Sequence, residues 1–160
     1  MRASNFFDKF ETKVKSMTWP GTSVKIFGEY RVKVVAEIPA QQLSQFDHPF
    51  ALIIDQGFVS DKEYQRLGWQ KFSIAIFVEN DQDSLGRSSM LGSGNYPDSS
   101  RGKGCKTIEE ILIYETLEVT LLDGEQVCIV PISLPKPQII TGNENSVFKF
   151  QSFQTWCSLD

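Results

Sequence analysis

Residues 49–55, Pro-Phe-Ala-Leu-Ile-Ile-Asp, form a run that is apolar almost throughout. A short continuous apolar run is typical of a strand that is buried on both faces of a sheet. Residues 70–79, Gln-Lys-Phe-Ser-Ile-Ala-Ile-Phe-Val-Glu, instead place a large apolar side chain at every second position. We therefore predict a central strand over Pro49–Asp55 and a neighbouring strand over Gln70–Glu79.

The residues before this pair predict a helix followed by two strands. Apolar residues recur at near-helical spacing over Asn5–Met17, behind Ser4 as the expected N-cap. Charged and β-branched residues then alternate over Ser23–Phe27 and Glu29–Ile38, and Gly28 is the expected bend between them. Ile38–Leu43 is expected to form a short helical turn.

The residues after the pair predict a loop, a helix and two final strands. Asn80–Gly104 is rich in Gly and Ser and is longer than an ordinary connection, so we expect a functional or mobile loop. A helix is predicted over Ile108–Leu121, with Thr107 and Glu110 in capping-box spacing and Asp123-Gly124 at its end. Strands are predicted over Val127–Leu134 and Ser146–Phe153. Pro131 places the first of these at a sheet edge or a bulge.

This order of elements predicts one α+β domain over residues 1–160, in which a single twisted mixed or antiparallel sheet is flanked by a few helices. The hydrophobic share of 41% supports a packed core. The N-terminal residues have neither a signal-peptide core nor a membrane span, so we expect no membrane association. The widely spaced Cys105, Cys128 and Cys157 are interpreted as buried, reduced thiols of a cytoplasmic protein.

No catalytic centre is predicted. Gly102-Lys103 is followed by Gly104 instead of Ser or Thr, which excludes a Walker A site. His48 is the only histidine and is interpreted as a turn residue. The acidic residues of this region are interpreted as loop and helix-start carboxylates rather than metal ligands; they are Asp81, Asp83, Glu109 and Glu110. We therefore predict no catalytic residue, no metal site and no cofactor.

Two further features exclude a nucleic-acid platform. The net charge is −4, whereas non-specific phosphate binding needs an excess of Lys and Arg. The aromatic residues near the C-terminus have too few cations around them to hold stacked bases, so we predict that they pack in the core. They are Phe148, Phe150, Phe153 and Trp156.

Several short sequence segments, taken together, resemble those of a known protein family. They are Trp19-Pro20-Gly21, Pro49–Ile54, Ile76–Asn80 and Gly102-Lys103-Gly104 leading into Thr107–Glu110. In these segments, and in the order of its elements from about Trp19, the chain resembles the tail terminator proteins of long-tailed bacteriophages. In that family an N-terminal helix precedes two core strands, a long loop and a helix follow, and paired strands complete the sheet.

The resemblance implies a structural virion protein at the junction of tail and neck, assembled in the host cytoplasm. It implies a homo-oligomeric ring, usually a hexamer, that caps the tail tube protein and provides a docking surface for a head-closure, stopper or neck protein. DNA would only pass through the ring.

Two alternatives stay open. Residues 29–38 and 86–104 are longer than a minimal terminator needs, which leaves another head–tail connector, such as a head-closure stopper, as the first alternative. The second is an unrecognised enzyme or ligand-binding domain. Because the chain is acidic overall, we expect the loop cations Arg87, Arg101 and Lys103 to contact acidic groups on an adjoining subunit or ring.

Overall fold

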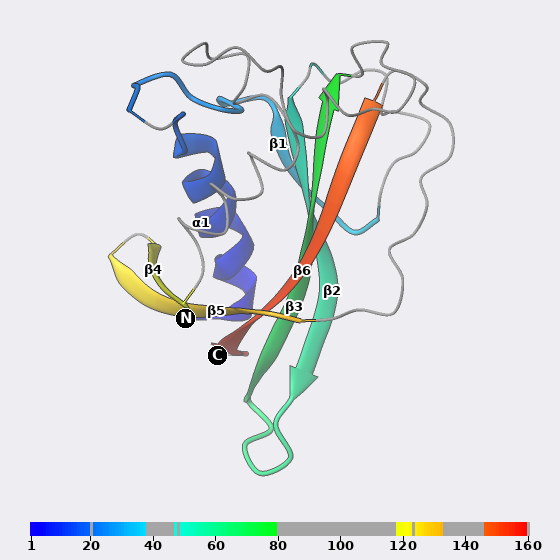
Figure 1. Ribbon diagram of the computed structural model, residues 1–160. Coiled ribbons are helices and arrows are strands. Elements are labelled where there is room, and N and C mark those ends of the chain that lie inside the picture. Colours follow the sequence, from blue (N-terminus) through cyan, green and yellow to red (C-terminus); the bar gives the residue numbers. More distant parts are fainter. Residues whose placement is uncertain are drawn as a thin grey trace.

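The fold is a six-stranded sheet with a helix packed on one face (Figure 1). The computed structural model describes residues 1–19, 21–37, 47, 49–79, 118–122, 124–132 and 146–159. The strand order is β1-β2-β3-β6-β5-β4, in which β1 runs parallel to β2 and the other neighbours are antiparallel. The elements are α1 (Ala3–Ser16), β1 (Val32–Val35), β2 (Phe50–Ser60), β3 (Leu67–Glu79), β4 (Glu118–Leu122), β5 (Glu125–Pro131) and β6 (Ser146–Ser158). The predicted α+β fold with one mixed sheet is confirmed.

The apolar run that opens β2 lies in the interior of the sheet. Its residues Phe50–Ile54 are all buried, and β2 is flanked by β1 and β3. β3 pairs with β2 on one side and with β6 on the other, so that Phe72 faces Phe153 across the strands. Both predicted strands are confirmed, and both continue beyond the predicted ends into the hairpin that joins them.

The main core lies between α1 and the sheet. Phe6, Phe10 and Val14 form the buried stripe of the helix, as their spacing predicts. The ring of Phe72 lies 4.9 Å from that of Phe6 and 5.1 Å from that of Phe10, and it stacks on Phe153 at 5.6 Å. Phe72 is therefore a central contact between the helix and the sheet.

The start of α1 differs from the prediction. Arg2 is the N-cap residue in place of Ser4, and its carbonyl oxygen accepts hydrogen bonds from the N–H groups of Asn5 and Phe6. The reason is that the preceding chain is fixed to the sheet: Arg2 bridges Ser158, whose N–H donates to the Met1 carbonyl at 2.9 Å. The helix therefore begins directly after Met1 and Arg2, the two residues that contact Ser158 of β6.

A second, smaller core occupies the opposite face of the sheet. It contains Phe50, Leu52, Ile54, Ala75 and Phe77, and the rings of Phe50 and Phe77 stack at 4.5 Å. The alternation of side chains along β2 and β3 sends every second residue to this face. The sheet is thus buried on both faces around Phe50–Ile54.

The predicted strand Ser23–Phe27 is wrong. This segment makes one isolated bridge, between Thr18 and Lys25, and then turns its neighbouring residues Ile26 and Phe27 both into the core. Two successive buried side chains cannot lie on one face of a strand, so packing overrides the alternation seen in the sequence. Gly28 has a φ of 73°, which favours glycine, but it does not join two strands, since only Val32–Val35 after it forms one.

The end of the predicted helix Ile108–Leu121 is also wrong. Glu118–Leu122 forms β4, which pairs with β5 from Glu118↔Ile129 to Leu122↔Glu125. Asp-Gly is a hairpin turn sequence as well as a helix-ending one, and Gly124 has the positive φ of 78° that such a turn requires. The apolar residues of this segment fit the spacing of a helix, but Glu118–Leu122 also contains residues that favour strands, so the sequence is compatible with both.

The last two strands are confirmed with changed ends. The sequence predicts an edge or a bulge at Pro131. β5 as a whole is internal, between β6 and β4, but Pro131 is its last residue and lies beyond the final β4 pair, where β5 has only β6 beside it. The remaining expectations lie outside the described residues. They are the turn Ile38–Leu43, His48, Cys105, the loop Asn80–Gly104 with Asp81 and Asp83, and Thr107, Glu109 and Glu110.

Candidate functional site

The β2–β3 hairpin, whose strands extend past the body of the molecule (Figure 1), carries an open surface pocket. The last strand pair is Ser60↔Gly68. In the turn, the carboxylate Oδ1 of Asp61 accepts hydrogen bonds from the N–H groups of Glu63 (2.8 Å) and Tyr64 (3.1 Å). The N–H of Asp61 donates to Leu67 at 2.8 Å. These bonds hold the turn in one conformation.

A β-bulge sets which side chains face the pocket. The register shifts between Asp55 and Gly57, and Gly57 has φ 95°, which favours glycine. The buried Gln70 stabilises the bulge, since its Nε2 lies 2.9 to 3.1 Å from three acceptors that share its two hydrogens: Asp55 Oδ1, Gly57 O and Lys71 O. Beyond the bulge Val59 lies opposite Trp69 and therefore on the same face of the sheet.

Three strands then place one row of apolar side chains on the face opposite α1. Val59 pairs with Trp69, and Trp69 pairs with Trp156 on β6. The two indole rings have centroids 5.1 Å apart at an interplanar angle of 76°, an edge-to-face arrangement. Trp156 is 38% exposed and Tyr64, from the turn, is 62% exposed.

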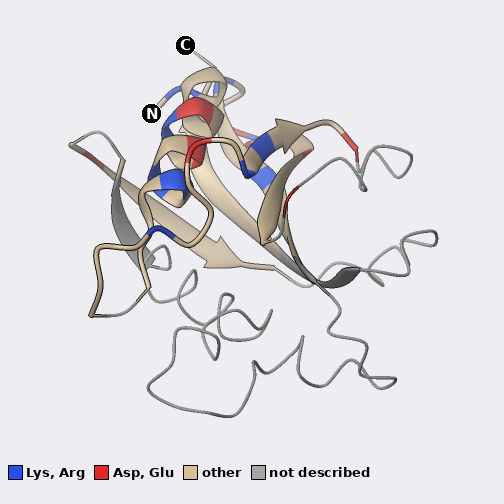
Figure 2. Cartoon of the chain, turned by 90° about the horizontal axis from the view of Figure 1, so that it is seen from above, with Lys and Arg blue, Asp and Glu red and all other residues tan. Residues whose placement is uncertain are grey.

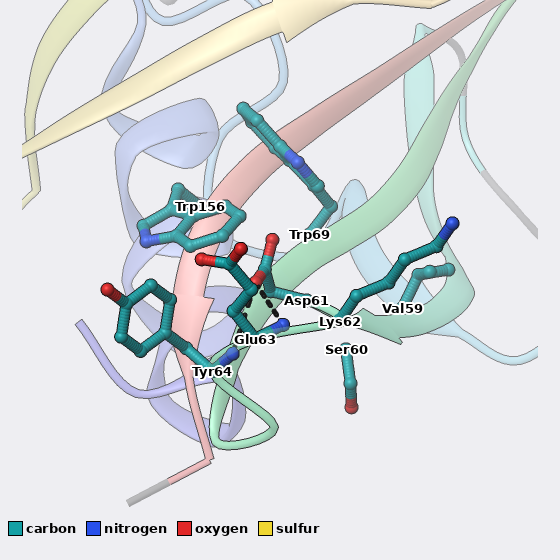
Figure 3. Close-up of a pocket in the computed structure, with 8 residues that line it drawn as sticks. All are labelled: Val59, Ser60, Asp61, Lys62, Glu63, Tyr64, Trp69 and Trp156. Carbon is teal, nitrogen blue, oxygen red and sulfur yellow. Dashed lines mark hydrogen bonds between the residues drawn. The ribbon is translucent and has the colours of Figure 1, made fainter.

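These residues line an open pocket of about 530 Å³. Figure 3 shows its lining: Val59, Ser60, Asp61, Lys62, Glu63, Tyr64, Trp69 and Trp156. The carboxylates of Asp61 and Glu63 point toward the aromatic rings, whereas the Lys62 side chain extends toward Val59 (Figure 3). Negative charge thus lies beside aromatic faces, an arrangement that attracts cations.

The charges of α1 are arranged differently. Figure 2 shows Lys and Arg interspersed with Asp and Glu along the helix. One such pair, Glu11 and Lys15, is hydrogen-bonded, and this bond raises the pKa of Lys15. A face of alternating sign has no strong preference for a charged partner. The hairpin pocket differs because its Lys62 side chain extends away from the aromatic rings, whereas the carboxylates of Asp61 and Glu63 point toward them (Figure 3).

The structure places the predicted residues in different surroundings. Phe153 is buried as predicted, but Trp156 is at the surface, so its assignment to the core is wrong. Phe153 and Cys157 point to the helix side, and the strand period of two therefore sends Trp156 to the other side. This period was the signal available in the sequence. The candidate contacts Arg87, Arg101 and Lys103 lie outside the described residues.

The two described cysteines also differ. Cys157 is buried as predicted, and this burial raises the pKa of its thiol to about 11. Cys128 is exposed, so its predicted burial is wrong. Its carbonyl oxygen accepts a hydrogen bond from the Thr155 hydroxyl at 2.9 Å.

Within the described residues, no group of three or more His, Cys, Asp or Glu side chains is arranged to hold a metal ion. The helix of this part of the chain is too short and too polar to cross a membrane. Comparison with known proteins finds no matching family model, curated protein or solved structure.

Proposed function

We propose that the chain is a structural assembly protein, a phage tail terminator that forms a ring on the end of the tail tube. The observation that carries the proposal is the β2–β3 hairpin, which projects from the sheet and exposes Val59, Tyr64 and Trp156 around one pocket. Exposed aromatic side chains are enriched where proteins bind other proteins. A projecting hairpin presents them to a neighbour without disturbing the core.

The order of elements supports the family part of the proposal. An N-terminal helix precedes the core strands β2 and β3, and the last strands complete the same sheet, as the resemblance to tail terminators implies. The proposal does not depend on catalysis. It depends on two different surfaces per subunit, because a closed ring needs head-to-tail contacts.

The hairpin is one such surface, and within the described residues the sheet has two edge strands, β1 and β4, that are further candidates. An edge strand presents backbone N–H and C=O groups that a second chain can pair with. Arg87, Arg101 and Lys103 stay the proposed cationic contacts to an adjoining subunit or ring.

The test is the mass of the purified protein by light scattering, together with negative-stain images of the protein alone and mixed with tail tubes from the same source. We expect a closed ring on the tube end, with fewer capped tubes after Arg87, Arg101 and Lys103 are all replaced by Ala. Rings that bind neck proteins but never tubes would assign the chain to the head–tail connectors instead. A protein that stays monomeric even beside tail tubes would overturn the ring.

A further inference from the structure

We propose that the hairpin pocket binds a guanidinium group, presented by an arginine side chain of a partner protein. The inference goes beyond ring formation, because it names the chemistry of a contact that the isolated chain can make. It rests on three aromatic rings and two carboxylates that line one open pocket, whose lining lysine, Lys62, extends away from the rings (Figure 3).

The two indoles supply the walls of the site. Trp69 and Trp156 stand nearly perpendicular, at 76°, with centroids 5.1 Å apart, so a planar cation can lie on the face of one ring beside the other. Tyr64 adds a third ring from the turn (Figure 3). Aromatic faces carry negative potential and attract cations, with Trp the strongest and Arg the cation found most often.

The two carboxylates supply charge and hydrogen-bond acceptors. Asp61 is held in place by the turn, whose N–H groups donate to its Oδ1, and its carboxylate points toward the aromatic rings (Figure 3). Among the described residues, no hydrogen bond or ion pair uses the Glu63 carboxylate. Guanidinium stacks on aromatic rings and donates in a planar fork to carboxylates, whereas ammonium is a strongly hydrated point charge. The combination of rings and acids therefore favours arginine.

The openness of the site favours a cation that belongs to a protein over a free one. Tyr64 and Val59 are 62% and 49% exposed, so they surround the charged centre with an apolar rim. A small free cation would leave this rim in water, whereas a partner surface would cover it and exclude water from the ion pair. The projecting hairpin makes such an approach possible (Figure 1).

The walls are held rigidly, which reduces the entropy lost on binding. Trp69 is fixed between Val59 and Trp156 in one cross-strand row. The preceding residue of β3, Gly68, lets the two strands approach closely, since a Cβ there would collide with Val59 O and lie 2.9 Å from Ser60 Cα. The binding geometry is therefore built into the hairpin before the ligand arrives.

The experiment is an NMR titration of the full chain that follows the three indole N–H signals. The probe is the capped peptide Gly-Arg-Gly, and its matched control contains citrulline, a neutral isostere of arginine. We expect the signals of Trp69 and Trp156 to move, while that of the buried Trp19 stays in place as an internal reference. The citrulline peptide should bind at least about 5-fold more weakly.

Variants test the protein side of the contact. The double variant D61N/E63Q keeps the acceptor atom of the turn and removes both charges, and it should weaken the arginine peptide at least about 5-fold. The matched control is D8N, the same chemical change at an exposed position of α1, which should leave binding unchanged. W156A should abolish the response at Trp69.

Three results would overturn the proposal. They are equal binding of the arginine and citrulline peptides, an unchanged affinity of D61N/E63Q, and binding of tetramethylammonium at least about 10-fold tighter than the arginine peptide, which would assign the pocket to a free quaternary ammonium ion. All are measured on the chain alone, so a failure here is distinguishable from a failure to form rings.

Discussion

Two groups of aromatic residues lie on opposite faces of the same sheet, and one group is buried whereas the other is exposed. Phe72 and Phe153, under α1, are at most 1% exposed, whereas Trp156 on the other face is 38% exposed. Both pairs, Phe72–Phe153 and Trp69–Trp156, are formed by the same two strands, β3 and β6. Aromatic character alone therefore does not decide whether these side chains are buried. Burial depends on which face of the sheet the position points to, since successive residues alternate between the faces, and on whether that face is covered.

The two groups of aromatic residues also differ in whether their side chains carry a polar atom. The phenylalanines have no polar atom and lose nothing when they are enclosed, whereas the indole and phenol groups of Trp156 and Tyr64 keep a polar atom at the surface. The first group stabilises the fold and the second is available to a partner. The following experiments separate these two roles, in order of expected effect.

Phe72→Ala should lower the free energy of unfolding by about 3 to 5 kcal/mol, because it removes a central contact between α1 and the sheet. Trp156→Ala, on the same pair of strands, should cost about 1 kcal/mol, the value of an exposed edge-to-face contact. Urea unfolding measures both. Equal losses for the two variants would contradict the division between a structural and a binding face.

Gly68→Ala should cost about 1 to 3 kcal/mol, because the added methyl group overlaps the backbone of β2 and the strands must separate. The loss should be local, so hydrogen exchange should quicken in the hairpin and stay slow around Phe50–Ile54. Ser60→Ala, at the exposed partner position of the same strand pair, is the control and should leave exchange unchanged. Uniform quickening along the chain would reject a local role.

Ser73 and Ser152 form a buried hydroxyl pair at 2.9 Å on the face of the second core. Replacing either one by Ala should cost about 1 to 2 kcal/mol, because the remaining hydroxyl loses its partner. The double variant should cost less than the sum of the two. A double-mutant cycle checks this, and strict additivity would show that the two hydroxyls do not interact.

Cys157 has a folded-state pKa of about 11, above the 9.0 of an ordinary thiol, because burial disfavours the thiolate. The unfolded chain therefore releases this proton first as pH rises, so the free energy of unfolding should fall between about pH 9 and pH 11, by about 2 kcal/mol. Cys157→Ser should remove this part of the pH dependence. A profile that is the same in both proteins would contradict the assignment.

The same difference predicts thiol reactivity. At about pH 8, iodoacetamide should modify the exposed Cys128 quickly and Cys157 only on unfolding, because the thiolate is the reactive form. Peptide mass mapping distinguishes the sites. Modification of Cys157 at the rate of Cys128 in the folded protein would show that its burial is not maintained in solution.

Much of the centre of the fold is predictable from local patterns. Phe50–Ile54 has no alternation and is a buried strand, and the spacing of Phe6, Phe10 and Val14 gives the buried face of α1. Errors arose where a pattern has two solutions. The apolar residues of Glu118–Leu122 fit a helix and a strand equally, and pairing with β5 decides for the strand.

The pocket was not predictable because its parts meet only through long-range register. Trp69 and Trp156 become neighbours when β3 pairs with β6, and Tyr64 joins them through the turn held by Asp61. No local motif marks these residues. The bulge at Gly57 adds a shift that alternation alone cannot foresee.

The bulge has a consequence for changes in chain length. Gln56 is the extra residue of β2 between the pairs Asp55↔Phe72 and Gly57↔Lys71. Its deletion would make these two pairs consecutive on both strands and would leave the register of all other pairs unchanged. Phe58 would still face α1, and Val59 would still face the pocket. Deletion of Val59 itself would shift the register of the following β2 residue by one, so that its side chain would point to the opposite face of the sheet. The hairpin is therefore tolerant to the loss of a residue at one position and intolerant only a few residues further on.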